Sequence, residues 1–163
     1  MNKPNTHAVA PPSELWDGEN AICSYCKGKA QLTAHGEYLY PYRKDYGSRW
    51  VCPECENTHV GCHPQTTIPL GRLANASLRN AKKAAHGAFD PLWKGKIAIE
   101  GCRPHKARRL GYEWLAAQLG IHVDQCHIGW FDEEQCQRVI EICEPYSVAL
   151  RTGTINNDLE VLP

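Results

Sequence analysis

Hydrophobic and polar positions follow two different patterns along this chain of 163 residues. Between Gly28 and Val51, aromatic residues and leucines alternate with polar ones, and Gly36 and Asp45–Gly47 have the composition of turns. Aromatic residues favour strands, and short apolar runs separated by turn residues are typical of hairpins. This segment therefore predicts a short antiparallel sheet, with strand residues Leu32, Tyr38, Leu39, Tyr40, Tyr42 and Trp50.

From Pro69 onward the apolar residues recur at helical spacing. Three helices are predicted: one from about Leu70 that ends at Asp90–Pro91, one over residues 104–119 that stops at Gly120, and one that begins after Asp132 and ends at Pro145. Asp132 is the expected N-cap of the third helix. We expect one helical core, made of Leu73, Leu78, Phe89, Trp93, Leu110, Trp114, Leu115, Leu119, Trp130, Phe131, Val139 and Ile140.

Nine cysteines are unusual for a chain of this length. The amino terminus lacks the apolar stretch of a secretory signal, so we expect the chain in the cytoplasm, where metal binding is a better explanation of cysteines than disulfides. Cys23-Ser-Tyr-Cys26 and Cys52-Pro-Glu-Cys55 each place two thiols two residues apart. This doubled spacing predicts a four-thiolate site for one structural Zn²⁺, with iron as the chemical competitor and unrelated free thiols as the simplest alternative.

The fold class that follows is α+β, with an N-terminal zinc β-ribbon and then a small helical domain of about three helices. We expect a mobile arm over residues 1–20, the ribbon over 21–65, the helical domain over 66–146 and a C-terminal tail over 147–163. Leu15 and Trp16 are the arm residues expected to dock on the folded part. No apolar run approaches the length that crosses a membrane, so no membrane partner is expected.

The sequence also resembles a known family over residues 21–143. The segments that carry the resemblance are CPECENTHVGCH, PLGRLANASLRNAKKAAHGAFDPLW, RRLGYEWLAAQLGI and CHIGWFDEEQC. They are similar to short bacterial and bacteriophage proteins that are described only as zinc-finger-containing. The resemblance implies the zinc ribbon and a bacterial or phage context, without a settled activity. Cys62, an additional cysteine in this region, is not taken as a ligand.

Charge is distributed unevenly although the formal net charge is zero. Residues 72–109 contain ten Lys or Arg against two Asp or Glu, whereas residues 110–163 contain two against nine. The basic segment is the candidate surface for DNA or RNA. The residues assigned to it are Arg72, Arg79, Lys82, Lys83, Lys106, Arg108 and Arg109. The alternative is a solvated helix face, or neutralisation by the acidic third helix through Glu133, Glu134 and Glu141.

Several other groups of residues have the chemistry of a site, each with a structural alternative. His86 and Asp90 lie four residues apart, as in a proton-accepting pair or at a helix end. The set Cys126, His127 and Asp132, with Cys136 shortly after, could form a metal or nucleophile site, or only a packed connection. His59 and His63 follow the second cysteine pair and could support it or lie on the surface.

Three functions follow from these observations. The first is a structural-zinc module that contacts nucleic acid or a nucleoprotein complex. The second is a phage or mobile-element accessory protein that binds and modulates a host protein. The third is an enzyme that uses His86 and Asp90, or Cys126, His127 and Asp132. The enzyme ranks last because no nucleotide-binding loop, nucleophile elbow or catalytic zinc motif is present.

Overall fold

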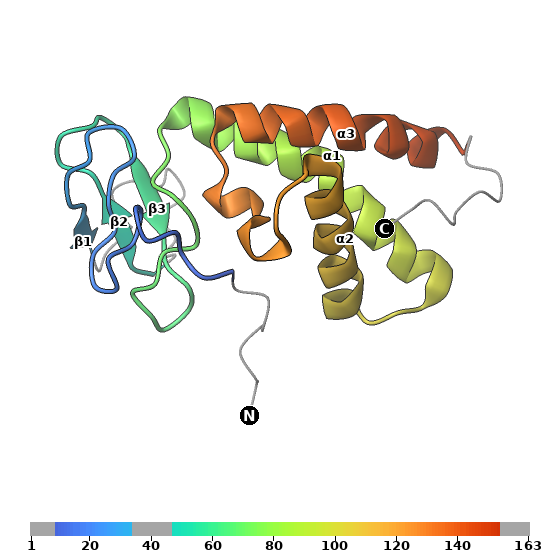
Figure 1. Cartoon of the computed structure of the whole chain (residues 1–163), viewed down its shortest axis with the longest axis horizontal. Coiled ribbons are helices and arrows are strands. Elements are labelled where there is room, and N and C mark those ends of the chain that lie inside the picture. Colours follow the sequence, from blue (N-terminus) through green and yellow to red (C-terminus); the bar gives the residue numbers. More distant parts are fainter. Residues whose placement is uncertain (1–8, 34–46, 154–163) are drawn as a thin grey trace. The chain divides into compact units, whose positions relative to one another are not determined.

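The computed structural model describes residues 9–33 and 47–153 (Figure 1). Their contacts divide the chain into two units. We call residues 11–80 together with 129–131 the ribbon unit, and residues 81–128 together with 132–153 the helical unit. The expected strand residues Tyr38, Leu39, Tyr40 and Tyr42 lie outside the described residues. The domain boundaries expected from the sequence stay predictions.

A small antiparallel sheet forms the centre of the ribbon unit. Its strands are β1 (Gln31–Thr33), β2 (Arg49–Val51) and β3 (His59–Gly61), in the order β1-β2-β3. Leu32, Trp50 and Val60 lie opposite one another in register. Trp50 is buried, and its indole N–H donates to the carbonyl of Thr67 at 2.7 Å. The predicted antiparallel sheet is therefore confirmed for β1 and β2, whereas β3, which follows the second cysteine pair, was not predicted.

The core of the ribbon unit joins the sheet to segments before and after it. The buried cluster consists of Ala21, Cys23, Ala30, Trp50, Cys52 and Leu73. Trp16 packs edge-on against Trp50, with ring centroids 5.7 Å apart, and Leu15 is buried. The expected docking of Leu15 and Trp16 is thus observed. The core contains two of the cysteines because so short a sheet buries little apolar surface of its own.

Helix α1 (Ala76–Glu100) begins later than the expected start near Leu70 and extends beyond the expected end at Asp90–Pro91. The prediction that it ends at Asp90–Pro91 is wrong, because Pro91 lies inside the helix. Proline removes one helical hydrogen bond and crowds the preceding turn, at a cost of about 3 kcal/mol. Phe89 and Leu92, on either side of Pro91, are fully buried. Burial of each contributes about 1.5–3 kcal/mol, which offsets this cost.

Helix α2 (Pro104–Leu119) has the predicted bounds, with Pro104 in its first turn. Gly120 ends it in the left-handed conformation, and Ile121 N–H donates to the carbonyl of Ala116, as in a Schellman motif. Two short 3₁₀ helices, η2 (Val123–Gln125) and η3 (Ile128–Trp130), follow. The predicted stop at Gly120 is confirmed.

Helix α3 (Glu133–Thr152) begins as predicted and ends later than predicted. Asp132 is its N-cap, in a capping box with Gln135. Pro145 lies inside the helix and does not end it, which corrects the prediction. Cys143 and Ser147, on either side of Pro145, are both buried, and the Ser147 hydroxyl donates to the carbonyl of Ala88 on α1. These contacts hold the helix together through the proline.

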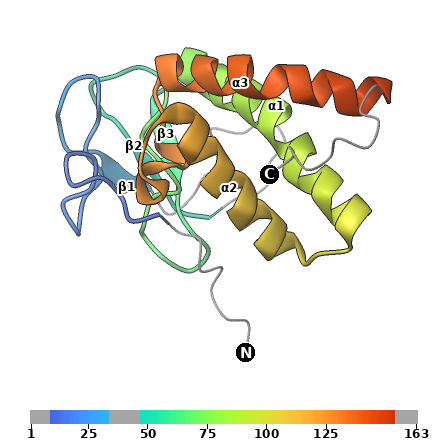
Figure 2. The ribbon, with the colours of Figure 1, turned by 45° about the vertical axis from the view of Figure 1, so that its right-hand side comes forward.

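The three helices of the helical unit pack closely. Figures 1 and 2 both show α1 and α3 side by side. A Cβ at Gly111 of α2 would lie 3.2 Å from side-chain atoms of Phe89 and Trp93, so glycine allows α1 and α2 to approach there. Phe89 also contacts the ring of Tyr112, with centroids 4.8 Å apart. Phe89 is therefore at the centre of the α1–α2 packing.

The single helical core that the sequence predicts is divided in the structure. Of its twelve residues, eight are buried and four, namely Trp93, Leu110, Trp114 and Ile140, are half-buried. Leu73, Leu78, Trp130 and Phe131 belong to the ribbon unit instead. The prediction of one core is therefore wrong, because Leu73 and Leu78, before and at the start of α1, and the segment between α2 and α3 with Trp130 and Phe131 group with the ribbon unit.

We expect Trp114→Ala to reduce the free energy of unfolding of the helical unit by about 2 kcal/mol. Full truncation of a buried aromatic residue costs about 3–5 kcal/mol, but Trp114 is half-exposed and keeps one edge-on contact, with Tyr146 at 5.5 Å. Urea denaturation followed by circular dichroism measures the change. Gln118→Ala, an exposed change on the same helix, is the control and should alter stability by less than about 0.5 kcal/mol.

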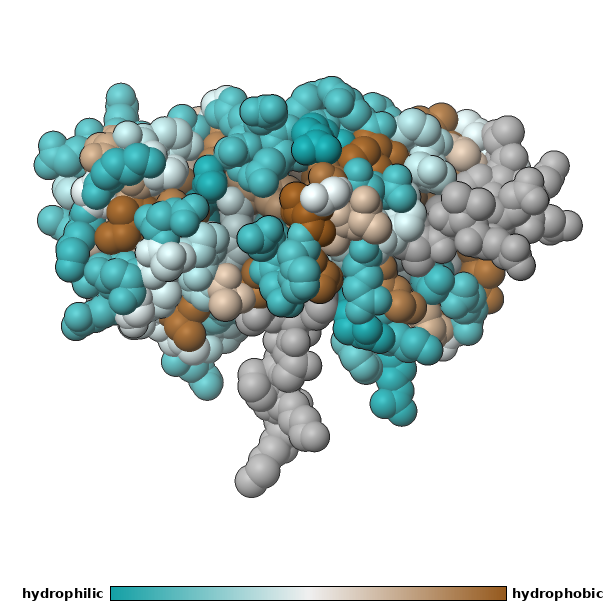
Figure 3. All heavy atoms as spheres, viewed as in Figure 1, coloured by the Kyte–Doolittle hydropathy of each residue, from teal (hydrophilic) through white to brown (hydrophobic). Residues whose placement is uncertain are grey.

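None of the helices in the described part of the chain has the length and apolarity needed to cross a membrane. The face shown in Figure 3 carries small groups of hydrophobic residues among hydrophilic ones. Within residues 9–33 and 47–153, the large hydrophobic residues that are exposed are Tyr25, Leu32, Ile68, Leu70, Ile99 and Val148.

Candidate metal centre

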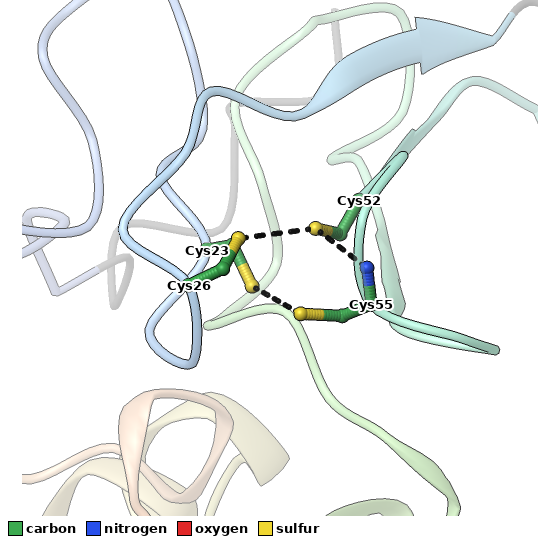
Figure 4. Close-up of side chains that lie close together, drawn as sticks. All are labelled: Cys23, Cys26, Cys52 and Cys55. Atoms are coloured by element: carbon green, nitrogen blue, oxygen red, sulfur yellow. Dashed lines mark hydrogen bonds between the residues drawn. The ribbon is translucent and has the colours of Figure 1, made fainter.

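The four cysteines predicted to bind metal lie together in the ribbon unit (Figure 4). Their sulfur atoms are all within 4.8 Å of one another. The Sγ atoms of Cys26 and Cys52 are 3.5 Å apart, and those of Cys23 and Cys55 are 3.9 Å apart. Four sulfurs at ~2.3 Å from a tetrahedral Zn²⁺ would be about 3.8 Å apart. The spacing therefore fits a tetrahedral metal and is too long for a disulfide, in which S–S is about 2.05 Å.

The first cysteine pair lies in a tight turn before β1. Lys27 N–H donates to the carbonyl of Cys23, and Cys23 N–H donates to the carbonyl of Gly28, each at 2.9 Å. Lys27 has a positive φ of 63°, which reverses the chain after the second cysteine. This turn aims both thiols in one direction.

The second pair repeats this arrangement after β2. Cys52 N–H donates to the carbonyl of Thr58 at 2.9 Å, and Asn57 has a positive φ of 49°. Cys55 N–H also approaches the sulfur of Cys52 at 3.3 Å. Asparagine tolerates the left-handed conformation better than most residues. Two similar turns thus present two thiols each to a common centre.

The surroundings of the sulfurs affect the pKa of each thiol differently. Burial raises the pKa of Cys23, and burial together with the neighbouring thiols raises that of Cys55 to about 12. Burial acts in the same direction on Cys52, but N–H donation from Glu54 and Cys55, with the thiols of Cys26 and Cys23, leaves its pKa lowered. Metal binding must displace the protons of the thiols whose pKa is raised. The main-chain N–H groups then stabilise the negative charge on sulfur.

Three other residues near the second cysteine pair, His59, Cys62 and His63, form hydrogen bonds outside the group of four thiols. His59 and Ala74 each donate a main-chain N–H to the carbonyl of the other. Burial of the His59 ring, and then the positive charges of Arg79 and Arg49, lower the pKa of His59 to about 4. The carbonyl of His63 accepts from Thr66, and the thiol of Cys62 points to the carbonyl of Thr67 at 3.6 Å. The cluster of four sulfurs does not include Cys62. A supporting role of His59 or His63 at the metal stays a prediction.

His86 and Asp90 form a pair within α1, away from either helix end. The Nδ1 atom of His86 lies 3.3 Å from Oδ1 of Asp90, which also accepts from the indole of Trp93 at 3.2 Å. Lys94 Nζ lies 3.5 Å from the other carboxylate oxygen. Burial raises the pKa of Asp90, but His86, Trp93 and Lys94 outweigh it and lower the pKa overall. The carboxylate thus orients three side chains of one helix.

The described contacts of Cys126, His127 and Asp132 differ in kind. Burial, with a contribution from Cys143, raises the pKa of the Cys126 thiol to about 12, so this thiol is protonated at neutral pH. His127 stacks on Tyr112, with centroids 5.5 Å apart. The carboxylate of Asp132 accepts from Gln135 N–H as a helix cap. No second cluster of three or more metal-binding side chains occurs within residues 9–33 and 47–153.

The residues assigned to the basic surface differ in their surroundings. The guanidinium of Arg79 donates to the carbonyls of Asn57 and Ala74, at 2.8 and 2.6 Å. Arg108 lies over the ring of Tyr112, and Arg109 pairs with Glu113. Arg72 and Lys82 are half-buried, whereas Lys83 and Lys106 are exposed. The contacts of Arg79 with the second cysteine turn were not predicted, because nothing in the spacing of residues 57 and 79 indicates them.

A protein family matches most of this chain. A family model described as a zinc-finger-containing domain matches residues 19–146, which include all four cysteines and most of the three helices. Comparisons with curated proteins and with solved structures found no match.

Proposed function

The chain belongs to this family of zinc-finger-containing domains, and from that premise we propose that it is a zinc-stabilised module that binds nucleic acid through α2. We assign the metal as Zn²⁺ because the family is described as zinc-finger-containing, and four thiolates provide a closed site with no open position for substrate. Such a metal stabilises the fold and leaves binding to other residues.

The observation that carries the proposal is the charge at the start of α2. Arg103 and Lys106 are exposed, and neither forms an ion pair with any residue that the structure describes. The first turn of this helix contains no acidic residue, and Arg103 provides no side-chain cap. Cations near a helix N-terminus oppose the helix dipole and cost about 0.3–1 kcal/mol each. Cations placed at such a cost support a role in binding a polyanion.

Three cations of the basic segment form ion pairs within their own helices. Lys94 pairs with Asp90, Lys96 with Glu100 and Arg109 with Glu113, each four residues away on its own helix. Glu133 and Glu134 are exposed in the first turn of α3, where carboxylates complement the helix dipole. These pairings favour a solvent-facing cationic surface over neutralisation by α3.

We expect binding to DNA or RNA that weakens steeply with salt. Four phosphate contacts, from Arg103, Lys106, Arg108 and Lys83, would reduce affinity for duplex DNA by about a hundredfold between 50 and 200 mM salt, because each contact releases counterions. Replacing Arg103 and Lys106 together by Gln should lower the slope of log affinity against log salt by about two. Fluorescence anisotropy with single- and double-stranded DNA and RNA measures both quantities.

A second double variant removes the same number of positive charges elsewhere in the chain. It tests whether binding depends on the cations at the start of α2 or only on the net charge of the protein. Lys29→Gln combined with Arg151→Gln removes two exposed cations outside α2 and should leave the salt slope unchanged. If neither DNA nor RNA binds at 50 mM salt, the nucleic-acid proposal is wrong and a protein partner becomes the better explanation of the charge.

A further inference from the structure

Both cysteine turns contact the residues that start α1. Tyr25 lies between Cys23 and Cys26, and its hydroxyl oxygen accepts from the main-chain N–H of Asn75 at 3.4 Å. Asn75 immediately precedes α1, and its side-chain oxygen accepts from Leu78 N–H at 2.9 Å, as a helix cap does. The first cysteine turn thus contacts the capping residue of the helix.

The second cysteine turn is attached to α1 through Arg79. This side chain reaches from the first turn of α1 to the carbonyl of Asn57, two residues after Cys55, and also donates to the carbonyl of Ala74. A charged donor that bonds two carbonyls makes stronger hydrogen bonds than a neutral donor does. Arg79 therefore ties the helix start to the turn that presents Cys52 and Cys55.

The strand after the second turn adds a third connection. His59 and Ala74 exchange two main-chain hydrogen bonds, at 3.2 and 3.0 Å, one residue before the helix cap. All of these residues belong to the ribbon unit. The first turn of α1 is consequently held by the same two turns that present the four thiols.

We propose that metal binding at Cys23, Cys26, Cys52 and Cys55 controls the order of the first turn of α1. The metal crosslinks two turns that otherwise depend on a small core, and the turns hold the capping residues of the helix. Metal loss frees the turns and exposes the amides of residues 78–80. Because binding equilibria are reciprocal, contacts that hold the helix start also strengthen metal binding.

Hydrogen exchange of the full chain, loaded with Zn²⁺ and after chelation by EDTA, tests the proposal. Chelation should accelerate exchange at the amides of residues 78–80 by at least about tenfold and leave residues 112–116 of α2 unchanged. Unchanged protection of residues 78–80 in metal-free protein would overturn the proposal. Equal loss of protection in α2 would also overturn it, because the metal would then support the whole chain without a local effect.

Reciprocity gives a second test with a matched pair of variants. Arg79→Gln should weaken Zn²⁺ binding about tenfold, within the usual range of coupling between sites, in competition with a chromophoric chelator. Lys83→Gln removes an exposed cation from the next turn of the same helix and should change Zn²⁺ affinity by less than about twofold. Equal affinities of the two variants would contradict the proposal.

Discussion

Cys52→Ser is expected to remove the metal and unfold the ribbon unit. A structural Zn²⁺ in a four-ligand site contributes about 10–16 kcal/mol, whereas a whole domain is stable by only about 5–15 kcal/mol. A serine hydroxyl does not ionise near neutral pH and cannot replace a thiolate ligand. Cys52 is also part of the buried cluster around Trp50, so both the metal and the packing are affected. Elemental analysis of the purified protein and near-ultraviolet circular dichroism of its tryptophans measure the two effects.

Cys62→Ser provides the control for this prediction. Cys62 is half-buried in the same unit and packs against the same cluster, but its thiol lies outside the group of four. We expect this variant to retain one metal ion per chain and the same near-ultraviolet spectrum. A Cys52→Ser protein that keeps a full equivalent of metal and melts at the same temperature as the parent would show that the four cysteines are not the ligands.

The metal centre could be predicted from sequence because its geometry is almost entirely local. Two residues between cysteines define a tight turn, and two such turns joined by a hairpin bring four thiols together whatever else the chain does. The positive φ of Lys27 and Asn57 carries no equally clear signal, since neither residue is glycine. The contacts from Tyr25 to Asn75 and from Arg79 to Asn57 join residues 50 and 22 positions apart. Contacts of that kind depend on packing and have no spacing rule.

The helix ends show which local rules packing can override. Gly120 ends α2 through its own backbone conformation, and Asp132 caps the start of α3 through its own side chain. Both helix ends were predicted from the sequence and are confirmed. Pro91 and Pro145 were expected to end helices, yet both lie inside them. The free-energy cost of a proline inside a helix comes from its own turn. Burial of the residues on both sides of each proline offsets this cost, and that burial depends on the rest of the fold. Sequence reasoning is therefore most dependable where the physical cause is confined to one turn.

The basic segment illustrates the same limit for charge. Counting charges along the chain located ten cations, but the structure assigns them different surroundings. Arg79 binds main-chain carbonyls, whereas Lys106 is exposed to solvent. A count of charges does not distinguish a cation that stabilises the fold from one that is available to a ligand. Our proposal therefore assigns nucleic-acid binding to fewer residues than the sequence suggested, namely those at the start of α2 and its neighbours.

Gly71→Ala is expected to destabilise the ribbon unit by about 3 kcal/mol or more. A Cβ at residue 71 would lie 2.0 Å from the carbonyl oxygen of Gly129 and 2.5 Å from its carbonyl carbon. Both are main-chain atoms, so no side-chain rotation relieves the overlap. Arg72 N–H donates to the same carbonyl at 3.0 Å, and the segments must separate to admit a methyl group. Separation would displace the buried side chains of Trp130 and Phe131. Overpacking of a tight core commonly costs about 1–3 kcal/mol, and main-chain overlap places this site at or above the upper limit.

Gly87→Ala separates this steric effect from the general effect of adding a methyl group. Gly87 is exposed within α1, and nothing lies within 4 Å of a Cβ built there. Alanine is favoured over glycine in helices by about 0.5–1 kcal/mol, so this variant should be more stable than the parent. Thermal unfolding of the zinc-loaded proteins measures both changes. Gly71→Ala should lower Tm by more than about 10 °C, since 1 kcal/mol corresponds to about 4–8 °C in a small domain. An unchanged Tm for Gly71→Ala would mean that residues 71 and 129 do not approach each other in solution.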